Sequence, residues 1–314
     1  KSHTYEIKPR HAGTMLYHCH VQTAQHFMMG LAGMFIVEEN RPNNWLQTFN
    51  IGAGQVRHPS ATVKKTFSQE YDLHYQSIDK KLAKIIQDAN DPRLVAEHMS
   101  RDYNMTESFE NYFLLNGHSF PYTLRDAMII ASENEDIKLH IANLQRSAIA
   151  VHIHGHKATI TALDGVDHPP AIQITRDVFD ISPAQRIDLH LLTQNNGLNS
   201  YGPGLWMFHD HTPTGTTTDG LEPGGNMAIL AYKELLDEQG MPKMHDEFFD
   251  QLFNKNYYAK KMAIWGEGEF APLLADAGLL APNYLQIILF GLTIGLIIGV
   301  LLLIILAYKR NQKQ

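Results

Sequence analysis

Histidines occur in this sequence in pairs whose two members are separated by one residue. Three such pairs stand out, His18-Cys19-His20, His152-Ile153-His154 and His209-Asp210-His211, and His156 follows His154 at the same spacing. Each pair ends an apolar segment that reads as a β-strand, and residues i and i+2 of a strand point to the same face. A single pair is often just two exposed strand histidines. Three pairs that can each present two imidazoles to one place predict a metal centre.

Cys19 is the single cysteine of the chain, and it lies between two histidines. In a strand its side chain points away from the face that His18 and His20 share, so it can bind a different metal ion. His26 follows seven positions later. A thiolate with imidazoles and a weak axial group is the ligand set of a type 1 copper site. One cysteine also excludes an intrachain disulfide framework and a zinc-finger cysteine set.

The composition favours a metal protein and excludes a general nucleic-acid binder. The 314 residues include 18 histidines and 12 methionines, and the formal net charge is -7. Imidazole and thioether groups are ligands that copper accepts. A chain with a net negative charge offers no basic surface for DNA or RNA.

The elements that must position these residues are predicted to be short strands. From about residue 108 to 232 the sequence alternates apolar and polar residues, clearly so at 136–141 and 186–191, and Asn116-Gly117 after 113–115 signals a turn. Short strands at this spacing favour an all-β sandwich or barrel.

One helix is expected in the polar region before these strands. Leu82, Ile85 and Ile86 share a face at helical spacing, and Ser77 is the expected N-cap. The first twenty residues already read as extended chain and Lys1 is not an initiator, so we expect the sequence to be N-terminally incomplete.

A long apolar run near the C-terminus predicts a membrane-spanning helix. Residues 285–308 would span roughly 36 Å as a helix, enough to cross a bilayer with some tilt. Lys309 and Arg310 follow the run, whereas Glu267 and Glu269 precede it. The positive-inside rule therefore predicts a cytoplasmic C-terminus and a body on the periplasmic or extracellular side.

The histidine motifs resemble those of multicopper oxidases. Residues 17–22 with 30–35 resemble the last copper motif of that family, residues 151–156 resemble its His-x-His-Gly motif, and residues 206–211 resemble the remaining pair. Matches to the cupredoxin framework occur at 116–121 and 180–186. The resemblance covers residues 10–40 and about 110–232. It implies cupredoxin-like Greek-key β-sandwich domains, of which this sequence holds the C-terminal end of one and the whole of another.

The expected organisation follows from this resemblance and from the apolar run. It comprises the C-terminal end of a first cupredoxin domain with the type 1 copper motif (1–40), a linker or insertion with a helix (41–106), a second cupredoxin domain (107–233), a juxtamembrane segment (234–282), a transmembrane helix (283–308) and a cytoplasmic tail (309–314).

The resemblance also implies a subtype. Asp210 stands where a copper cysteine would be, and Ile149 stands where a type 1 histidine would fall. This pattern is similar to the two-domain, laccase-like multicopper oxidases in which only the first domain carries type 1 copper. Members of that subtype build a trinuclear copper cluster between subunits, which implies a homotrimer and further histidine ligands upstream of Lys1.

Roles for the ligands are likewise implied by the family. Type 1 copper is assigned to Cys19 and His26. The trinuclear cluster is assigned to six histidines: His152 for type 2 copper, His154, His209 and His211 for the type 3 pair, and His18 and His20 as further ligands of the cluster. This gives about four coppers per protomer. The axial position falls at Leu31, which would not coordinate; Met29, beside Met28, stays open as the alternative. The spacing from Cys19 to His26 is two residues longer than in typical laccases.

The activity implied by the family is oxygen reduction. A donor would be oxidised one electron at a time at type 1 copper, and dioxygen would be reduced to water by four electrons at the trinuclear cluster, with His18, Cys19 and His20 between the two. The sequence does not identify the donor: phenols, cuprous or manganous ions and a small electron-transfer protein all fit.

Two other functions stay open. A copper nitrite reductase is also a trimeric two-domain cupredoxin, but it needs only a mononuclear type 2 site, and the histidines at 20, 209 and 211 favour a trinuclear one. A non-catalytic copper-binding or electron-transfer subunit of a membrane complex is the second alternative, motivated by the glycine-rich apolar run.

Overall fold

The computed structural model describes residues 2, 4–37, 67–89, 91, 93–243 and 252–258. The chain divides into two compact units, residues 1–245 and residues 246–314. In the second unit, α6 (Lys255–Tyr258) is the helix that the structure describes. No helix within the described residues is long and apolar enough to cross a bilayer. The helix expected at 283–308 and the tail at 309–314 lie outside the described residues.

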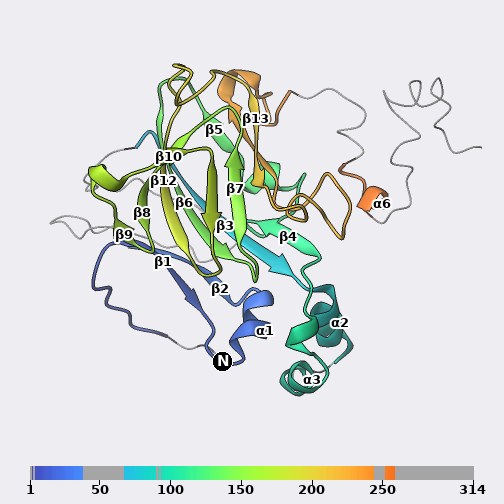
Figure 1. Ribbon diagram of the computed structural model, residues 1–314. Helices are drawn as coiled ribbons and strands as arrows, with labels where there is room; N and C mark the ends of the chain where they lie inside the picture. Colours follow the sequence, from blue (N-terminus) through green and yellow to red (C-terminus); the bar gives the residue numbers. More distant parts are fainter. Residues whose placement is uncertain are drawn as a thin grey trace, which may run out of the picture. The chain divides into compact units, whose positions relative to one another are not determined.

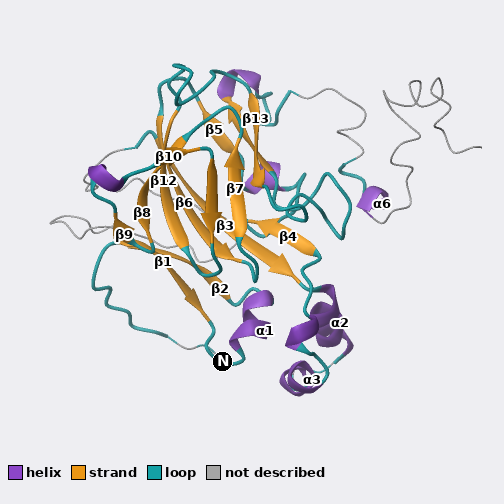
Figure 2. Cartoon of the chain, viewed as in Figure 1, coloured by secondary structure: helices purple, strands orange, loops and turns teal. Residues whose placement is uncertain are grey.

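Two sheets make up most of the first unit (Figures 1 and 2). The larger sheet has the order β10 (Thr175–Arg176), β8 (Ala158–Leu163), β12 (Arg186–Leu192), β6 (Asp136–Leu144), β3 (Gln69–Ile78), β4 (Tyr112–Leu115), with β9 (Val166–Asp167) paired to β8. The smaller sheet has the order β11 (Val178–Ile181), β7 (Ile149–Ile153), β13 (Leu205–Asp210), β14 (Ala228–Tyr232), β5 (Ile129–Ala131). The all-β prediction is confirmed.

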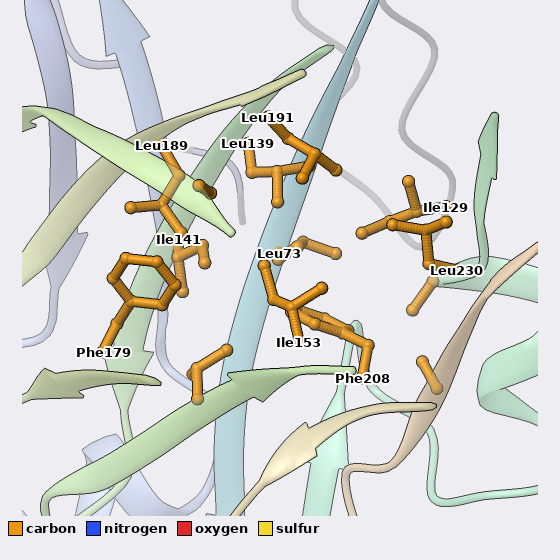
Figure 3. Packing of buried hydrophobic residues seen from close by; sticks show 14 of the residues in the cluster. Leu73, Ile129, Leu139, Ile141, Ile153, Phe179, Leu189, Leu191, Phe208 and Leu230 are labelled. Atoms are coloured by element: carbon orange, nitrogen blue, oxygen red, sulfur yellow. The ribbon is translucent and has the colours of Figure 1, made fainter. Parts of the chain in front are cut away.

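The core lies between these sheets (Figure 3). The larger sheet contributes Leu139, Ile141, Leu189 and Leu191, and the smaller sheet contributes Phe179, Ile153, Phe208, Leu230 and Ile129. Every second residue of a strand faces inward, which is the alternation that the sequence shows at 136–141 and 186–191. Two of the three histidine pairs begin on neighbouring strands of the smaller sheet, with His152 on β7 and His209 on β13.

Residues 69–78 differ from the expected organisation. They lie inside the range 41–106 predicted as a linker or insertion, yet they form β3, which pairs in parallel with β6 and antiparallel with β4. Leu73 and Tyr75 of β3 are fully buried in the core. The β-sandwich therefore begins before residue 107.

The predicted helix is α2 (Lys80–Asp88), followed by α3 (Val95–Arg101). Its N-cap is Asp79 instead of Ser77: the Asp79 carboxylate accepts hydrogen bonds from the amides of Lys81 (2.7 Å) and Leu82 (3.2 Å). Ser77 still belongs to β3. The apolar face of α2 packs as predicted, in a cluster of Leu82, Ile85, Ile86, Met28, Met99 and Tyr103.

Several short elements complete the first unit. The predicted turn after β4 forms, with positive φ at Asn116 (51°) and Gly117 (85°). The short helices are α4 (Thr123–Asp126), η1 (Met105–Glu107), η2 (Pro170–Ile172) and η3 (Lys233–Leu235).

A separate hairpin carries the cysteine motif. It consists of β1 (Gly13–His18) and β2 (Ala32–Val37), joined through α1 (Thr23–Met28). Thr14 of β1 is buried, and its hydroxyl donates to the Asp188 carboxylate of β12 at 2.6 Å. A side chain at Gly13 would collide with the backbone of Gly165 in the β8–β9 turn, so glycine permits the close approach of the hairpin.

Candidate metal centre

Cys19 and His26 come together within the hairpin. Cys19 directly follows β1, and His26 lies on α1, whose first turn begins after Gln22 in a left-handed conformation (φ 52°). The Cys19 Sγ atom lies 3.1 Å from His26 Nδ1. The longer spacing between these two residues is therefore taken up by α1, which returns the imidazole to the thiol. A thiol and an imidazole this close suit a shared soft metal ion.

Leu31, the residue expected in the axial position, forms backbone hydrogen bonds with both Cys19 and His26. The Cys19 amide donates to the Leu31 carbonyl (2.9 Å), and the Leu31 amide donates to the His26 carbonyl (3.0 Å). Met28, in contrast, is buried in the cluster with α2 and α3. Met29 is more than one-third exposed. Leu31 is itself 51% exposed, so exposure does not separate it from Met29, and Leu31 as the axial residue stays a prediction.

The imidazoles of His18 and His20 share a side, as the strand argument predicts. Their ring centroids lie 5.8 Å apart at an interplanar angle of 31°. His18 Nδ1 forms a hydrogen bond with the Cys19 carbonyl at 2.9 Å. Because that nitrogen is engaged, Nε2 is the nitrogen of His18 available to a metal.

The other two pairs form a cluster of four imidazoles. His152 of β7 and His209 of β13 are register partners, and His154 and His211 follow their strands. The Nε2 atoms of His154 and His209 lie 3.0 Å apart. Ring centroids within the cluster are separated by 4.5 Å (152–154), 5.2 Å (154–209), 5.3 Å (209–211) and 5.5 Å (152–211). We call these residues the four-histidine cluster.

Burial keeps part of this cluster in the form that binds metal. Burial, together with the neighbouring imidazoles, lowers the pKa of His154 below its ordinary value. Burial likewise lowers the pKa of His209, against the opposing effect of its hydrogen bond to the Asp210 carbonyl. Both rings are therefore neutral near pH 7, and neutral imidazole is the ligand form of histidine.

The structure does not bring the His18/His20 pair to the four-histidine cluster. Among the described residues, no hydrogen bond or ring contact joins the two sets. Nor do any three histidine, cysteine, aspartate or glutamate side chains of the described ranges stand close enough to hold a metal ion by themselves.

Three buried residues, His156, Ser200 and Tyr232, lie behind His154. His156 Nδ1 bonds to the His154 carbonyl (3.0 Å), while His156 Nε2 faces the Tyr232 hydroxyl (3.0 Å) and the Ser200 hydroxyl (3.1 Å). Burial lowers the pKa of His156. This buried group holds the chain that follows β7. Tyr232 and Ser200 come from distant segments, so no spacing in the sequence connects them to the cluster.

A surface hollow of about 220 Å³ opens beside the cluster. Its lining includes His152 and His154 together with Lys157, Asp177, Leu198 and Tyr201. The cluster is therefore reachable from outside the chain.

Two family models match this chain, and both describe multicopper oxidase domains. One matches residues 1–42 and the other residues 87–234, so together they cover more than half of the sequence. The chain belongs to the multicopper oxidase family. It is therefore a copper oxidoreductase, and copper is the cofactor that the family implies.

Solved structures agree with this assignment. A blue copper oxidase from Nitrosomonas europaea is 26% identical to this multicopper oxidase, with a TM-score of 0.55 over 82% of this chain and 67% of that chain. The multicopper oxidase mgLAC has the same fold, with 20% identity and a TM-score of 0.53 over 79% of this chain and 63% of that chain. The chain thus spans about two thirds of each. No curated protein sequence matches it.

The residues of this multicopper oxidase fit copper. The thiol of Cys19 lies beside one imidazole, and the Nε2 atoms of His154 and His209 lie 3.0 Å apart. Thiolate with imidazole suits a blue copper site, and clustered neutral imidazoles suit further copper ions.

Proposed function

We propose that this chain is a membrane-anchored, oxygen-reducing multicopper oxidase. It would couple the one-electron oxidation of a donor to the four-electron reduction of dioxygen to water. The observation that carries the proposal is the presence of two different donor sets in one chain: a thiol–imidazole pair at Cys19 and His26, and the four-histidine cluster.

The roles of the chain's residues follow from their places. Cys19 and His26 would hold type 1 copper near the surface, with Leu31 beside them as a non-coordinating axial residue. His18 and His20 flank Cys19 in sequence and face a common side, so a single stretch of backbone joins the two kinds of site. Bound copper would supply the one-electron redox chemistry and the centre that reduces dioxygen.

The trinuclear site would be completed between protomers. The His18/His20 pair and the four-histidine cluster do not meet within the described part of one chain, and His20 and His211 are both exposed. We place the pair of one protomer against the cluster of the next in a homotrimer, with His152 on type 2 copper and His154, His209 and His211 on the type 3 pair. Head-to-tail contacts of this kind close into rings.

The membrane anchor and the location belong to the same proposal. Its support is the apolar run at 285–308 with Lys309 and Arg310 after it. Membrane fractionation of cells that make the full chain should leave the protein in the membrane until detergent is added. Added protease should reach the copper-binding body only from the periplasmic or extracellular side.

Copper content and paramagnetic resonance of the full-length protein test the catalytic proposal. We expect about four coppers per chain, a blue type 1 signal, a type 2 signal and a spin-silent pair. Oxygen uptake should consume about four equivalents of a one-electron donor per dioxygen without releasing peroxide.

Other outcomes point elsewhere. About two coppers per chain without a silent pair would reject the trinuclear site and make nitrite the substrate to test. Full copper loading without turnover under any donor would assign the chain to electron transfer in a larger membrane complex.

A further inference from the structure

Asp210 lies between two cluster histidines and is completely buried. Its exposed fraction is 0%. Because side chains alternate along a strand, its carboxylate points to the face of β13 opposite the imidazoles of His209 and His211.

Three hydrogen-bond donors converge on this carboxylate. Oδ1 accepts from the amides of Ala150 and Thr212, each at 3.0 Å, and Oδ2 accepts from the Thr212 hydroxyl at 2.9 Å. Ala150 belongs to β7, which carries His152, and Thr212 directly follows His211. One side chain thus joins the two segments that carry the histidine pairs.

Backbone contacts extend this connection. The His211 amide donates to the Ala150 carbonyl at 2.8 Å, and the Asp210 amide donates to the Asn226 side-chain oxygen at 3.3 Å. A Cβ atom at Gly215 would lie 2.6 Å from Asp210 Oδ2, so the glycine leaves the space that the carboxylate occupies. The neighbouring backbone therefore leaves room for the Asp210 carboxylate and binds it.

The cost of burial shows that these bonds matter. A buried carboxylate is unfavourable unless its oxygens accept hydrogen bonds or meet a cation. No lysine or arginine within the described residues forms an ion pair with Asp210. The stabilisation comes from the three donors, all of which belong to the segments around the cluster.

We infer that Asp210 is a positioning residue: by binding β7 and the turn after His211, it fixes the separation of the His152/His154 pair from the His209/His211 pair. This rests on the proposed function, in which those imidazoles hold copper. Groups behind metal ligands set ligand orientation, and their loss commonly weakens metal binding by about 10- to 100-fold.

Two substitutions of Asp210 separate the effect of its hydrogen bonds from the effect of its negative charge. Asp210→Ala removes all three accepted bonds. Asp210→Asn keeps them, because its oxygen can accept from both amides and its NH₂ group can donate to the Thr212 hydroxyl. We expect Asp210→Ala to weaken binding of Cu²⁺ by the four-histidine cluster at least about tenfold, and Asp210→Asn to restore most of it.

A control variant separates positioning from general stability. Leu189→Ala on β12 makes a cavity in the opposite sheet and should lower the melting temperature. Titration of the full-length, copper-depleted protein with Cu²⁺ is followed by calorimetry and paramagnetic resonance below both melting temperatures. The type 1 signal of Cys19 and His26 serves as the internal reference and should stay unchanged in every variant.

The outcomes are distinguishable. If the wild-type chain binds no Cu²⁺ at these histidines, the proposed function fails before the role of Asp210 is reached. If wild type binds and Asp210→Ala binds as well as Leu189→Ala, the inference is overturned. If Asp210→Ala does not fold, Thr212→Val removes only the hydroxyl bond: a weaker cluster affinity supports the inference, and an unchanged one overturns it.

Discussion

At the scale of single residues, the orientation of the imidazoles is set by backbone carbonyls. Nδ1 of His18, of His152 and of His209 each lies within 3.1 Å of a carbonyl oxygen, those of Cys19, Asp177 and Asp210 respectively. In each case Nε2 is left for a metal. The tautomer is thereby fixed before copper binds, which lowers the entropy lost on binding.

Substitution of the cysteine tests the division into two donor sets. In Cys19→Ser the thiolate is lost, while the four-histidine cluster keeps its contacts. We expect the blue type 1 signal to disappear and copper content to fall by about one ion per chain, with the remaining copper retained. Oxygen uptake should fall to background. A variant that kept its blue signal would show that Cys19 is not the type 1 ligand.

His74 of β3 is expected to make stability depend on pH. Its Nε2 atom is buried without a hydrogen-bond partner, and burial lowers the pKa of His74 from 6.5 to about 4. Between these values the unfolded chain binds a proton that the folded chain does not, so stability falls as the pH is lowered from 6.5 towards 4.

Denaturation of the copper-loaded protein at several pH values measures this effect. His74→Phe should reduce the loss of unfolding free energy over this interval. His98→Phe is the matched control, because His98 is exposed on α3 and pairs with Asp102. If the unfolding free energy of wild type and of His74→Phe changed equally with pH, His74 would not be the group responsible.

At the scale of elements, the hairpin that carries Cys19 is attached through a buried polar group. Thr14 donates to Asp188 (2.6 Å) and lies 2.7 Å from His140 Nδ1, and Lys138 pairs with Asp188 at 3.3 Å. Burial by itself would raise the pKa of Asp188, but His140, Lys138 and Thr14 outweigh it and hold the pKa well below its ordinary value. The ionised carboxylate stabilises the fold above pH 4, and this contribution is lost under stronger acid.

Removal of the Thr14 hydroxyl should loosen this attachment. Thr14→Val leaves the Asp188 carboxylate and His140 with one partner fewer in a buried place, which should cost about 1–3 kcal/mol of unfolding free energy. Chemical denaturation measures the change. Thr175→Val is the control, since it makes the same substitution and loses a hydroxyl hydrogen bond, to Thr159, on the surface. Equal effects of the two substitutions would show that burial of the group is unimportant.

Strands could be predicted from the sequence where apolar and polar residues alternate with a period of two. Sequence reasoning identified β4, β6 and β12, and it placed His18 and His20 on one side. It missed β3, although Glu70, Asp72, His74 and Gln76 alternate there with residues such as Leu73 and Tyr75, because the segment carries few aliphatic residues and its pairing with β6 joins residues 68 positions apart. The group of His156, Ser200 and Tyr232 depends on tertiary contacts alone.

At the scale of the whole molecule, an intersubunit cluster predicts complementation between defective chains. His20→Ala and His209→Ala chains made separately should each lack dioxygen reduction. In each mixed trimer, about one of the three interfaces would join an intact His20 to an intact His209, so roughly a third of the activity should return. Coexpression with two affinity tags isolates the mixed trimers. No recovery in trimers shown to contain both chains would place the cluster within one chain.

The position of β3 also limits how such a protein can be divided. If two domains were joined by a dispensable linker, the chain could be cut within the linker, and each domain could be exchanged or expressed by itself. Here β3 of the larger sheet precedes α2 and α3 in the chain, so a fragment starting at residue 107 would lack the strand between β4 and β6. The exposed edge of β6 would invite pairing with other chains. Recombination that preserves the fold therefore has to cut before residue 69.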